Sequence, residues 1–424
     1  MKRLLLILLA IIILVPLAIV AWLALFFDAN DYRQQMADGF QKATGREINI
    51  AGDLNTSFFP WIGIETGAIE VANAAGFGDA PLAAIKGSKI HLKLRPLFSG
   101  EIEMDTVVLD GLQANLVTRA DGKTNWDFTG TSSSDSNKKT DEETSSDDAG
   151  KALAALAIGG IEMKDASITW DDRKGGTKLD LTAMNLETGA ISFDTPIAVS
   201  FNTGFAMNGD EMKGNMKATT GVVLSSDLQK VNLNKLNLDI DATGTVLEGG
   251  KLKTGLKSDI NVDLATQLVS SDKLTFDMDL AGDIAPVNPM KIAVNSPLKI
   301  NLATMVIDLP TMQYSVPGSE GSGSLNLSNL DKPMPTIKMK LKTDKFDATP
   351  WMGTATTQTG LNTIQNTIQN RIQIEQLLLS LMSIRSVSAA EKSTPVDIPV
   401  EMIRQLDVDA SLNIANFIMD TLQA

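Results

Sequence analysis

The 424-residue sequence contains no cysteine and one histidine, His91. Without cysteine there is neither a disulfide framework nor a thiolate metal site, so packing and backbone pairing have to hold the fold together. Catalysis with a histidine base requires a nucleophile and an orienting carboxylate beside that histidine. His91 instead alternates with Lys89 and Lys93, which is typical of the polar face of a strand, and we expect it to be solvated.

Other chemistry-bearing patterns are equally sparse. Asp171-Asp172 point to opposite faces if they lie on a strand, and Asp147-Asp148 fall in a polar segment, so neither pair suits shared acid and base work. No phosphate-binding loop, dinucleotide fingerprint or HExxH motif is present. We therefore expect a protein that is not an enzyme and needs no metal or cofactor, and an envelope hydrolase is the least favoured reading.

Positive charge is also in short supply, with 37 Lys and Arg against 51 Asp and Glu and a formal net charge of −14. This balance argues against a nucleic-acid partner, because nucleic-acid affinity depends on neutralising phosphates. It also predicts no overall attraction to anionic lipid headgroups. Aromatic residues make up only 5% of the chain, and we interpret Trp126 and Trp170 as core or groove-lining residues.

Long hydrophobic runs are absent except at residues 4–27, between Leu4 and Phe27. As a helix this run would rise roughly 36 Å at about 1.5 Å per residue, which is enough to cross a bilayer core. Pro16 is tolerated in a membrane helix. A cleaved signal peptide is the alternative, but Trp22 and Phe27 are bulky where a cleavage site needs small residues, so an uncleaved anchor is favoured.

Lys2 and Arg3 precede the run, which predicts a cytoplasmic tip at residues 1–3 and a body outside the cytoplasm on a single span. After the span, Asn30 or Asp31 is a plausible helix N-cap, and Gly45 is a plausible C-terminal cap. Tyr32, Met36 and Phe40 share one face of that helix. The helix can lie on the membrane or cap the end of a sheet, and the pattern does not separate these two readings.

From Glu47 the period changes to two, which indicates strands with one apolar and one polar face. Tight turns are predicted at Asp110-Gly111, Asp121-Gly122, Gly175-Gly176, Asn208-Gly209 and Gly249-Gly250. The predicted fold is mostly β, an elongated, curled antiparallel sheet built from a meander of hairpins, with an N-terminal transmembrane helix and a few amphipathic helices. The alternating segments include Ile48 to Ile50, Ile90 to Leu94, Ile102 to Met104, Leu112 to Leu116, Leu179 to Leu181, Leu236 to Ile240, Leu274 to Leu280, Leu298 to Leu302 and Ile337 to Leu341.

Composition divides the body further. Residues 28–128 are expected to form a helix and a first β module, and residues 151–358 a β-groove module. Between them, residues 129–150 have no large apolar side chain and are interpreted as a disordered linker, with an acidic interaction tail or calcium site as the minor alternative. Residues 359–384 have helical spacing, which suits a helix packed across a sheet end or, less favoured, a lid. Residues 385–424 begin another β region.

Several short motifs carry a family resemblance. They are Asn30-Asp31-Tyr32-Arg33, Phe59-Pro60-Trp61, residues 122–127 (GKTNWD), Gly160-Ile161, residues 165–172 (DASITWDD) and residues 186–191 (LETGAI). Each is weak alone, but in this order the sequence resembles the AsmA family of proteobacteria over nearly its whole length. Residues 404–414 look like the opening of that family's C-terminal β region, most of which we expect to be missing.

The resemblance implies a protein of the bacterial inner membrane with a periplasmic body that supports outer-membrane homeostasis. AsmA proteins are also similar to bridge-like lipid-transfer proteins, in which a β-groove carries acyl chains. Independently, strands with one apolar face and too few helices to cover it must curl around themselves or around another apolar body. Phospholipid acyl chains are the expected partner, together with the inner membrane.

A non-enzymatic assembly or regulatory factor for outer-membrane protein insertion, which binds envelope proteins instead of lipid, is the alternative hypothesis. The lipid hypothesis predicts one continuous apolar surface. Its candidate lining residues are Ile90, Leu92, Leu94, Ile168, Trp170, Leu179, Leu181, Leu236, Leu238, Leu274, Phe276 and Met278.

Overall fold

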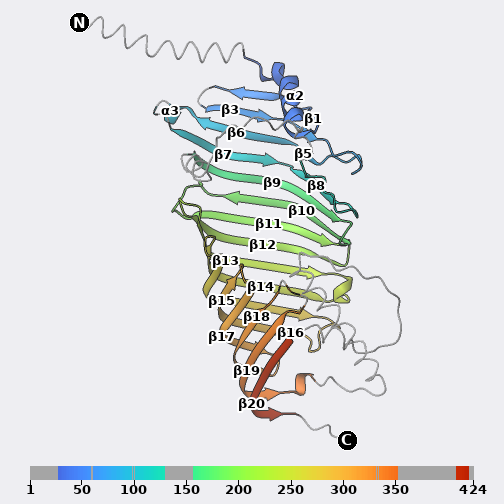
Figure 1. Ribbon diagram of the computed structural model, residues 1–424, viewed down its shortest axis with the longest axis vertical. Helices are drawn as coiled ribbons and strands as arrows, with labels where there is room; N and C mark the ends of the chain where they lie inside the picture. The colour runs from blue at the N-terminus through green and yellow to red at the C-terminus, as the bar shows by residue number, and fades with distance from the viewer. Residues whose placement is uncertain are drawn as a thin grey trace, which may run out of the picture. The chain divides into compact units, whose positions relative to one another are not determined.

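The computed structural model describes residues 27–58, 61–97, 99, 101–128, 156–330, 332, 334–351 and 407–419. Strands dominate (Figure 1), as the sequence predicts. The chain divides into unit 1, residues 1–174 and 181–192, and unit 2, residues 175–180 and 193–424. The predicted linker at 129–150 and helix at 359–384 lie outside the described residues. So does the predicted span apart from Phe27, and no described helix is long and apolar enough to cross a membrane.

Unit 1 begins with a short 3-10 helix, η1 (Ala29–Tyr32), that leads into α2 (Arg33–Thr44). The predicted cap at Asn30 or Asp31 is wrong. Asp28 is the N-cap of η1, where its carboxylate accepts from the Asn30 amide, and the N-cap position of α2 is Tyr32, whose side chain makes no capping hydrogen bond. Hydrogen bonds from the Asn30 backbone and side chain hold the pKa of Asp28 below its ordinary value. Gly45 ends α2 at φ 69°, a left-handed conformation that glycine adopts without strain, so the predicted C-terminal cap is confirmed.

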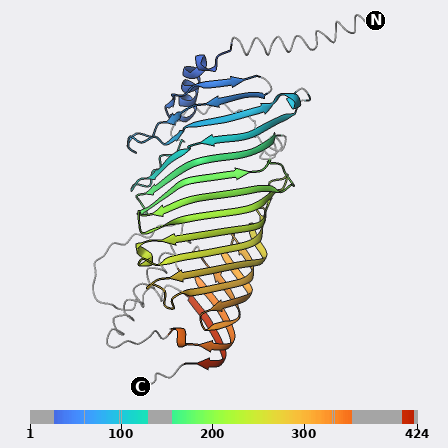
Figure 2. The same cartoon turned by 180° about the vertical axis from the view of Figure 1, so that it is seen from behind.

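Unit 1 then forms one open sheet of short strands (Figure 2). Antiparallel pairs join β2 to β3, β3 to β6 and β6 to β7, and a second series joins β1 to β4, β4 to β5 and β5 to β8. The strands are β1 (Ile48–Ile50), β2 (Leu54–Ser57), β3 (Trp61–Thr66), β4 (Ile69–Val71), β5 (Ala83–Ile85), β6 (Gly87–Lys93), β7 (Ile102–Asp110), β8 (Gln113–Thr118) and β9 (Leu156–Asp172).

These short strands are halves of longer ones. β1 runs into β2, β3 into β4, β5 into β6 and β7 into β8, each across a break of one to three residues. The Asp110-Gly111 hairpin prediction is therefore wrong: β7 and β8 do not pair with each other but lie along successive parts of β9. Gly111, at φ 59°, supplies the break.

Both pairings of β9 with β7 and β8 are parallel, which departs from the predicted all-antiparallel meander. Parallel neighbours require a crossover connection of a dozen or more residues, and the chain between Thr118 and Leu156 is long enough to provide one. Within that connection the predicted tight turn at Asp121-Gly122 is confirmed, because Thr118 bridges Thr124 across it. The helical turn α3 (Leu94–Leu97) also ends the predicted strand at Lys93, so Leu94 is not a strand residue.

In unit 2, each strand from β11 to β19 pairs antiparallel with the next. β20 closes the series in parallel with β19. The bounds are β11 (Ile197–Met207), β12 (Met212–Leu224), β13 (Lys230–Thr243), β14 (Lys251–Asp263), β15 (Leu268–Ala281), β16 (Met290–Asn301), β17 (Val306–Val316), β18 (Ser319–Ser328), β19 (Thr336–Asp347) and β20 (Asp407–Ile418).

Positive backbone φ angles mark the predicted turns. Asn208 and Gly209, at 45° and 73°, join β11 to β12, and Gly176, at 73°, precedes β10 (Thr177–Thr188). Gly249, at 79°, belongs to a longer connection that includes the 3-10 helix η3 (Thr245–Leu247). The two shorter turns confirm the hairpin prediction, whereas the third is a longer loop than expected.

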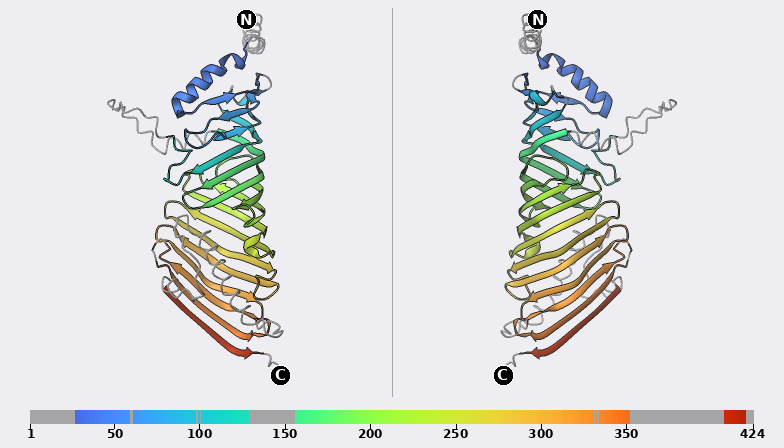
Figure 3. Two further views of the ribbon diagram at one scale, coloured as in Figure 1. Left: turned by 90° about the vertical axis from the view of Figure 1, so that its right-hand side faces the viewer. Right: turned by 90° about the vertical axis from the view of Figure 1, so that its left-hand side faces the viewer.

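A line of β-bulges crosses β12 to β17 in unit 2, and we call it the crease. The register shifts after Thr219 in β12, Leu233 in β13, Ser258 in β14, Ser271 in β15, Asn295 in β16 and Leu309 in β17, whereas the shift between β18 and β19 lies near a strand end, at Glu320. A bulge bends its strand and increases the local twist, so a row of bulges curves a sheet. The part of the sheet that carries the crease is accordingly curved, as Figure 3 shows.

Candidate functional site

The strands of unit 2 place apolar side chains on one face. Registered partners put Leu238 beside Leu256, Leu256 beside Phe276, and Phe276 beside Val294. We call this the apolar face. Across β13 to β16 it carries Leu236, Leu238, Ile240, Leu252, Leu256, Leu274, Phe276, Met278, Ile292 and Val294.

The apolar face is partly covered and partly open. Leu274 and Leu280 are buried at 9% and 6% exposure, whereas Leu238, Leu256 and Phe276 keep intermediate exposure. The interior side chains of a two-layer sandwich would be packed at crystal-like density and removed from water. In the described part of unit 2, the strands instead form one layer.

One end of the apolar face is closed. Met212, Ala242, Leu247, Leu280, Ile284 and Ala285 form a buried cluster that η3 and the β15–β16 connection complete. Met278 and Leu252 are packed against this cluster. The cluster lies at the start of β12 and the end of β13, so it covers the apolar face only at one end of the strands. It does not cover their central part.

The crease carries small polar residues that the alternation did not reveal. Ser258, Ser271 and Ser296 are buried at 7%, 3% and 3% exposure, and the Ser258 and Ser271 hydroxyl oxygens lie 2.7 Å apart. Ser271 Oγ also accepts from the Lys273 amide at 3.1 Å, and Ser258 Oγ donates to the Asp259 carbonyl at 3.2 Å. The hydroxyls thus satisfy backbone groups that the bulges free.

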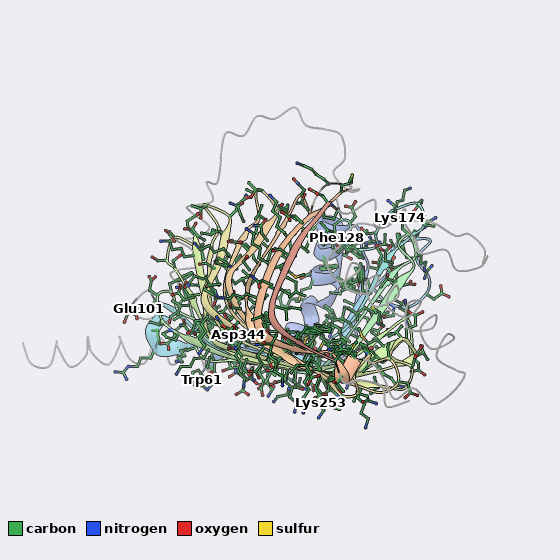
Figure 4. The ribbon with its side chains drawn as sticks, turned by 90° about the horizontal axis from the view of Figure 1, so that it is seen from below. Trp61, Glu101, Phe128, Lys174, Lys253 and Asp344 are labelled. Carbon is green, nitrogen blue, oxygen red and sulfur yellow. The ribbon has the colours of Figure 1, made fainter. Side chains whose placement is uncertain are left out.

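The opposite face of unit 2, which we call the polar face, is a ladder of alternating charge. Lys213 and Lys217 of β12 are followed by Asp239 and Asp241 of β13, and then by the lysines of β14. Lys253 lies between Asp241 and Asp279 in register, and its Nζ is 3.8 Å from an Asp241 oxygen. Figure 4 shows Lys253 on the outer side of the curved sheet, so the apolar face is the concave one.

Turn carboxylates of unit 2 are held in their charged form. Hydrogen bonds from Thr266 keep the pKa of Asp263 below its ordinary value, and the Ser225 hydroxyl does the same for the pKa of Asp227. These groups are fully exposed and stabilise turns locally. They point to no reaction chemistry.

The structure separates the predicted lining residues into two groups. Leu236, Leu238, Leu274, Phe276 and Met278 share the apolar face of unit 2. In unit 1, Ile90 is 39% exposed, Leu92 pairs with Met104, and Ile168 and Trp170 pair with Ala114 and Leu116. Leu94 begins α3 instead of extending β6, and Leu179 and Leu181 lie in β10, which the two units divide between them.

His91 is less solvated than its pattern suggested. Its side chain is 18% exposed, and the ring lies over Gly63, where an added Cβ would be 2.1 Å from His91 Cδ2. Its Nε2 is 3.3 Å from a Glu65 carboxylate oxygen, but the geometry is not that of a hydrogen bond.

Asp171 and Asp172 are similarly occupied. Asp171 pairs with Arg173 at 2.8 Å, and the Asp172 carboxylate accepts from the Lys174 amide. Among the residues the structure describes, no three His, Asp or Glu side chains are placed to hold a metal ion.

Two of the family-like motifs lie at structural junctions in unit 1. Asn30 Oδ1 accepts from the Leu54 amide at 2.9 Å, and its Nδ2 donates to the Leu54 carbonyl at 3.3 Å, which ties η1 to β2. Asn125, in the GKTNWD segment, is completely buried and fastens β8 to a neighbouring loop. Sequence reasoning quoted both motifs without finding these roles.

A single-layer, curved β-sheet with one apolar concave face and one charge-alternating face defines a class of proteins that offer an extended amphipathic surface instead of an enclosed pocket. The chain belongs to the AsmA family: the sequence profile of that family matches residues 1–285. No curated protein and no solved structure matches the chain significantly.

Proposed function

We propose that this chain is an inner-membrane-anchored periplasmic protein whose apolar face shields phospholipid acyl chains, in support of outer-membrane homeostasis. The observation that supports the proposal is the row of half-open apolar side chains that continues from strand to strand in unit 2. Membership of the AsmA family is consistent with an envelope role.

The physics of such a face suits an acyl chain. Each methylene that leaves water contributes roughly 0.8 kcal/mol, so several carbons against Leu238, Leu256 and Phe276 are enough for retention. Because neighbouring strands present similar side chains, displacement of the chain by one strand exchanges one apolar contact for another. The apolar face therefore retains an acyl chain, and no single position along the face binds the chain much more strongly than the next.

A minimal pair of variants tests this. Phe276 and Thr275 are adjacent in β15 and point to opposite faces. We expect Phe276→Asp to abolish co-purification of phospholipid with the detergent-purified full chain, because a carboxylate on the apolar face is costly to desolvate. Thr275→Asp adds the same charge to the polar face and should leave bound lipid unchanged. Native mass spectrometry and lipid extraction provide the measurement.

A second measurement avoids the added charge. A photo-crosslinking aromatic residue at position 276 should label phospholipid acyl chains, and the same residue at 275 should not. Lipid-free protein that folds normally, or equal labelling from both positions, would refute the proposal. Labelling of envelope proteins alone would favour the assembly-factor alternative.

A further inference from the structure

The edge of unit 2 formed by β19 and β20 differs from the rest of that sheet in charge. On the polar face of β19, Lys338, Lys340 and Lys342 alternate, and all three are exposed. After the bulge at Asp344, Lys345 is registered with Glu320. Four lysines therefore follow one strand in a chain whose net charge is −14.

Two of these lysines have no acidic register partner, unlike Lys253 of β14 and Lys291 of β16. Lys340 is registered with Ser324 and Ser411, and Lys342 with Ser322 and Asn413. Neither forms an ion pair with any described residue. By contrast, Lys253 of β14 and Lys291 of β16 pair with Asp241 and Asp279 at 3.8 and 3.7 Å.

The same edge exposes its apolar residues. Leu412 and Phe417 of β20 are 56% and 59% exposed, and Met419, just beyond the strand, is 57% exposed. These values compare with intermediate exposure for the apolar face of β13 to β16. Phe417 stacks on Phe346 with ring centroids 5.8 Å apart, which holds it at the edge.

Apolar and basic residues are concentrated along the same half of the strand pair. Phe417 lies on the same face of β20 as Ser411 and Asn413, the partners of Lys340 and Lys342, whereas Leu412 is registered with Leu341 on the other face. The acidic residues of β20, Asp407 and Asp409, lie at its opposite end. Apolar side chains next to lysines on flexible stems are the combination that binds the headgroup region of an anionic bilayer.

We propose that the β19–β20 edge docks on the surface of a bilayer that contains anionic phospholipid. Phe417 and Met419 enter the interface, while Lys340 and Lys342 contact lipid phosphates. Net negative charge does not prevent this, because charges more than roughly 8–10 Å away are screened at physiological ionic strength. The proposal does not require that acyl chains occupy the apolar face.

A strand from another protein, or from a second copy of the chain, is the competing occupant, because β20 has one hydrogen-bonded neighbour among the described strands. Strand addition would use the backbone of β20 and would not depend on the charge of β19. The lysines that have no acidic register partner therefore favour the bilayer.

The test uses the full chain reconstituted in phosphatidylcholine nanodiscs, immobilised through the scaffold protein, with vesicles passed over it. We expect capture of vesicles that contain phosphatidylglycerol and weak capture of pure phosphatidylcholine vesicles. Lys340→Gln with Lys342→Gln should weaken capture by about fivefold for each lysine removed. Phe417→Ser should also reduce capture. The matched control, Lys253→Gln with Lys291→Gln, removes the same charge from acid-flanked positions and should bind like the parent.

Equal capture by the Lys340/Lys342 variant and the control would overturn the proposal, and so would equal capture of neutral and anionic vesicles. Dimerisation that depends on Leu412 without vesicle capture would assign the edge to strand addition instead. Because lipid co-purification is measured separately at Phe276, loss of docking and loss of the apolar-face function are distinguishable.

Discussion

Asn125 offers a sharp test of how unit 1 is held together. Its Oδ1 accepts from the Val117 amide at 2.9 Å, and its Nδ2 donates to the Asn115 carbonyl at 2.7 Å and to Asn73 Oδ1 at 3.1 Å. The side chain has no exposed surface. It therefore joins β8, the loop at Asn73 and the segment after β8 through one amide.

The substitution Asn125→Asp keeps the shape and replaces the donor nitrogen by oxygen. Two hydrogen bonds are lost. The Asn115 carbonyl oxygen and Asn73 Oδ1 then face a carboxylate oxygen in place of their donor. Since an unsatisfied buried polar group costs about 1–3 kcal/mol, the total is about 3–5 kcal/mol. Each 1.4 kcal/mol corresponds to roughly tenfold in the opening equilibrium, so amide protection in β8 should fall by roughly 100- to 4,000-fold.

Hydrogen exchange followed by mass spectrometry on residues 113–128 measures this loss directly. Burial raises the pKa of the new carboxyl group, so the folded state binds an extra proton and the variant should recover stability as the pH falls. Gln113→Glu, an exposed amide-to-acid change on the same strand, is the control. Unchanged protection in Asn125→Asp at neutral pH would refute the idea that this amide holds the junction.

Three further outcomes follow from the packing and charges. Ser271→Leu should destabilise unit 2 by about 1–3 kcal/mol in denaturant unfolding, because the buried Ser271 side chain has no space beside it for a larger one. Ser270→Leu, on the other face, should change stability little. Gly63→Ala should displace the His91 ring and lower stability, since the new Cβ meets both His91 and the Ile90 carbonyl; an unchanged melting temperature would contradict this. The lowered pKa of Asp263 means that its turn is stabilised fully above the ordinary Asp pKa and loses that contribution as pH falls through the folded-state value. The stability difference between wild type and Asp263→Asn should therefore shrink in acid.

Alternation predicted the strands of unit 2 well, because each of β13 to β16 has one apolar face and no competing periodicity. Parity grouped Leu236 with Leu238, and Leu274 with Phe276 and Met278, and the strand register places both groups on the apolar face. Alternation predicts which face a side chain occupies only as far as the next bulge. A bulge adds one residue, so every later side chain of the strand moves to the other face. Ser258 and Ser271 lie at such points and looked like ordinary polar positions.

The errors in unit 1 have a related cause. Asp110-Gly111 has the composition of a hairpin turn, yet the same left-handed glycine serves a break within a strand, and only tertiary pairing decides between the two. The parallel neighbours of β9 depend on connections whose path leaves no local signature. Asn125 is one of many asparagines, and its burial is set by contacts with Asn73, far away in sequence.

The crease has a consequence for how such a sheet can change in size. Each strand from β12 to β17 carries its own bulge, so the curvature of this part of the sheet does not depend on how many strands are present. Insertion or removal of one hairpin that carries a bulge and a small residue at its centre would change the length of the sheet and keep the width of its cross-section. The length of the sheet and the width of its cross-section can therefore change independently. Duplication of a hairpin in the gene would lengthen the apolar surface without altering its curvature.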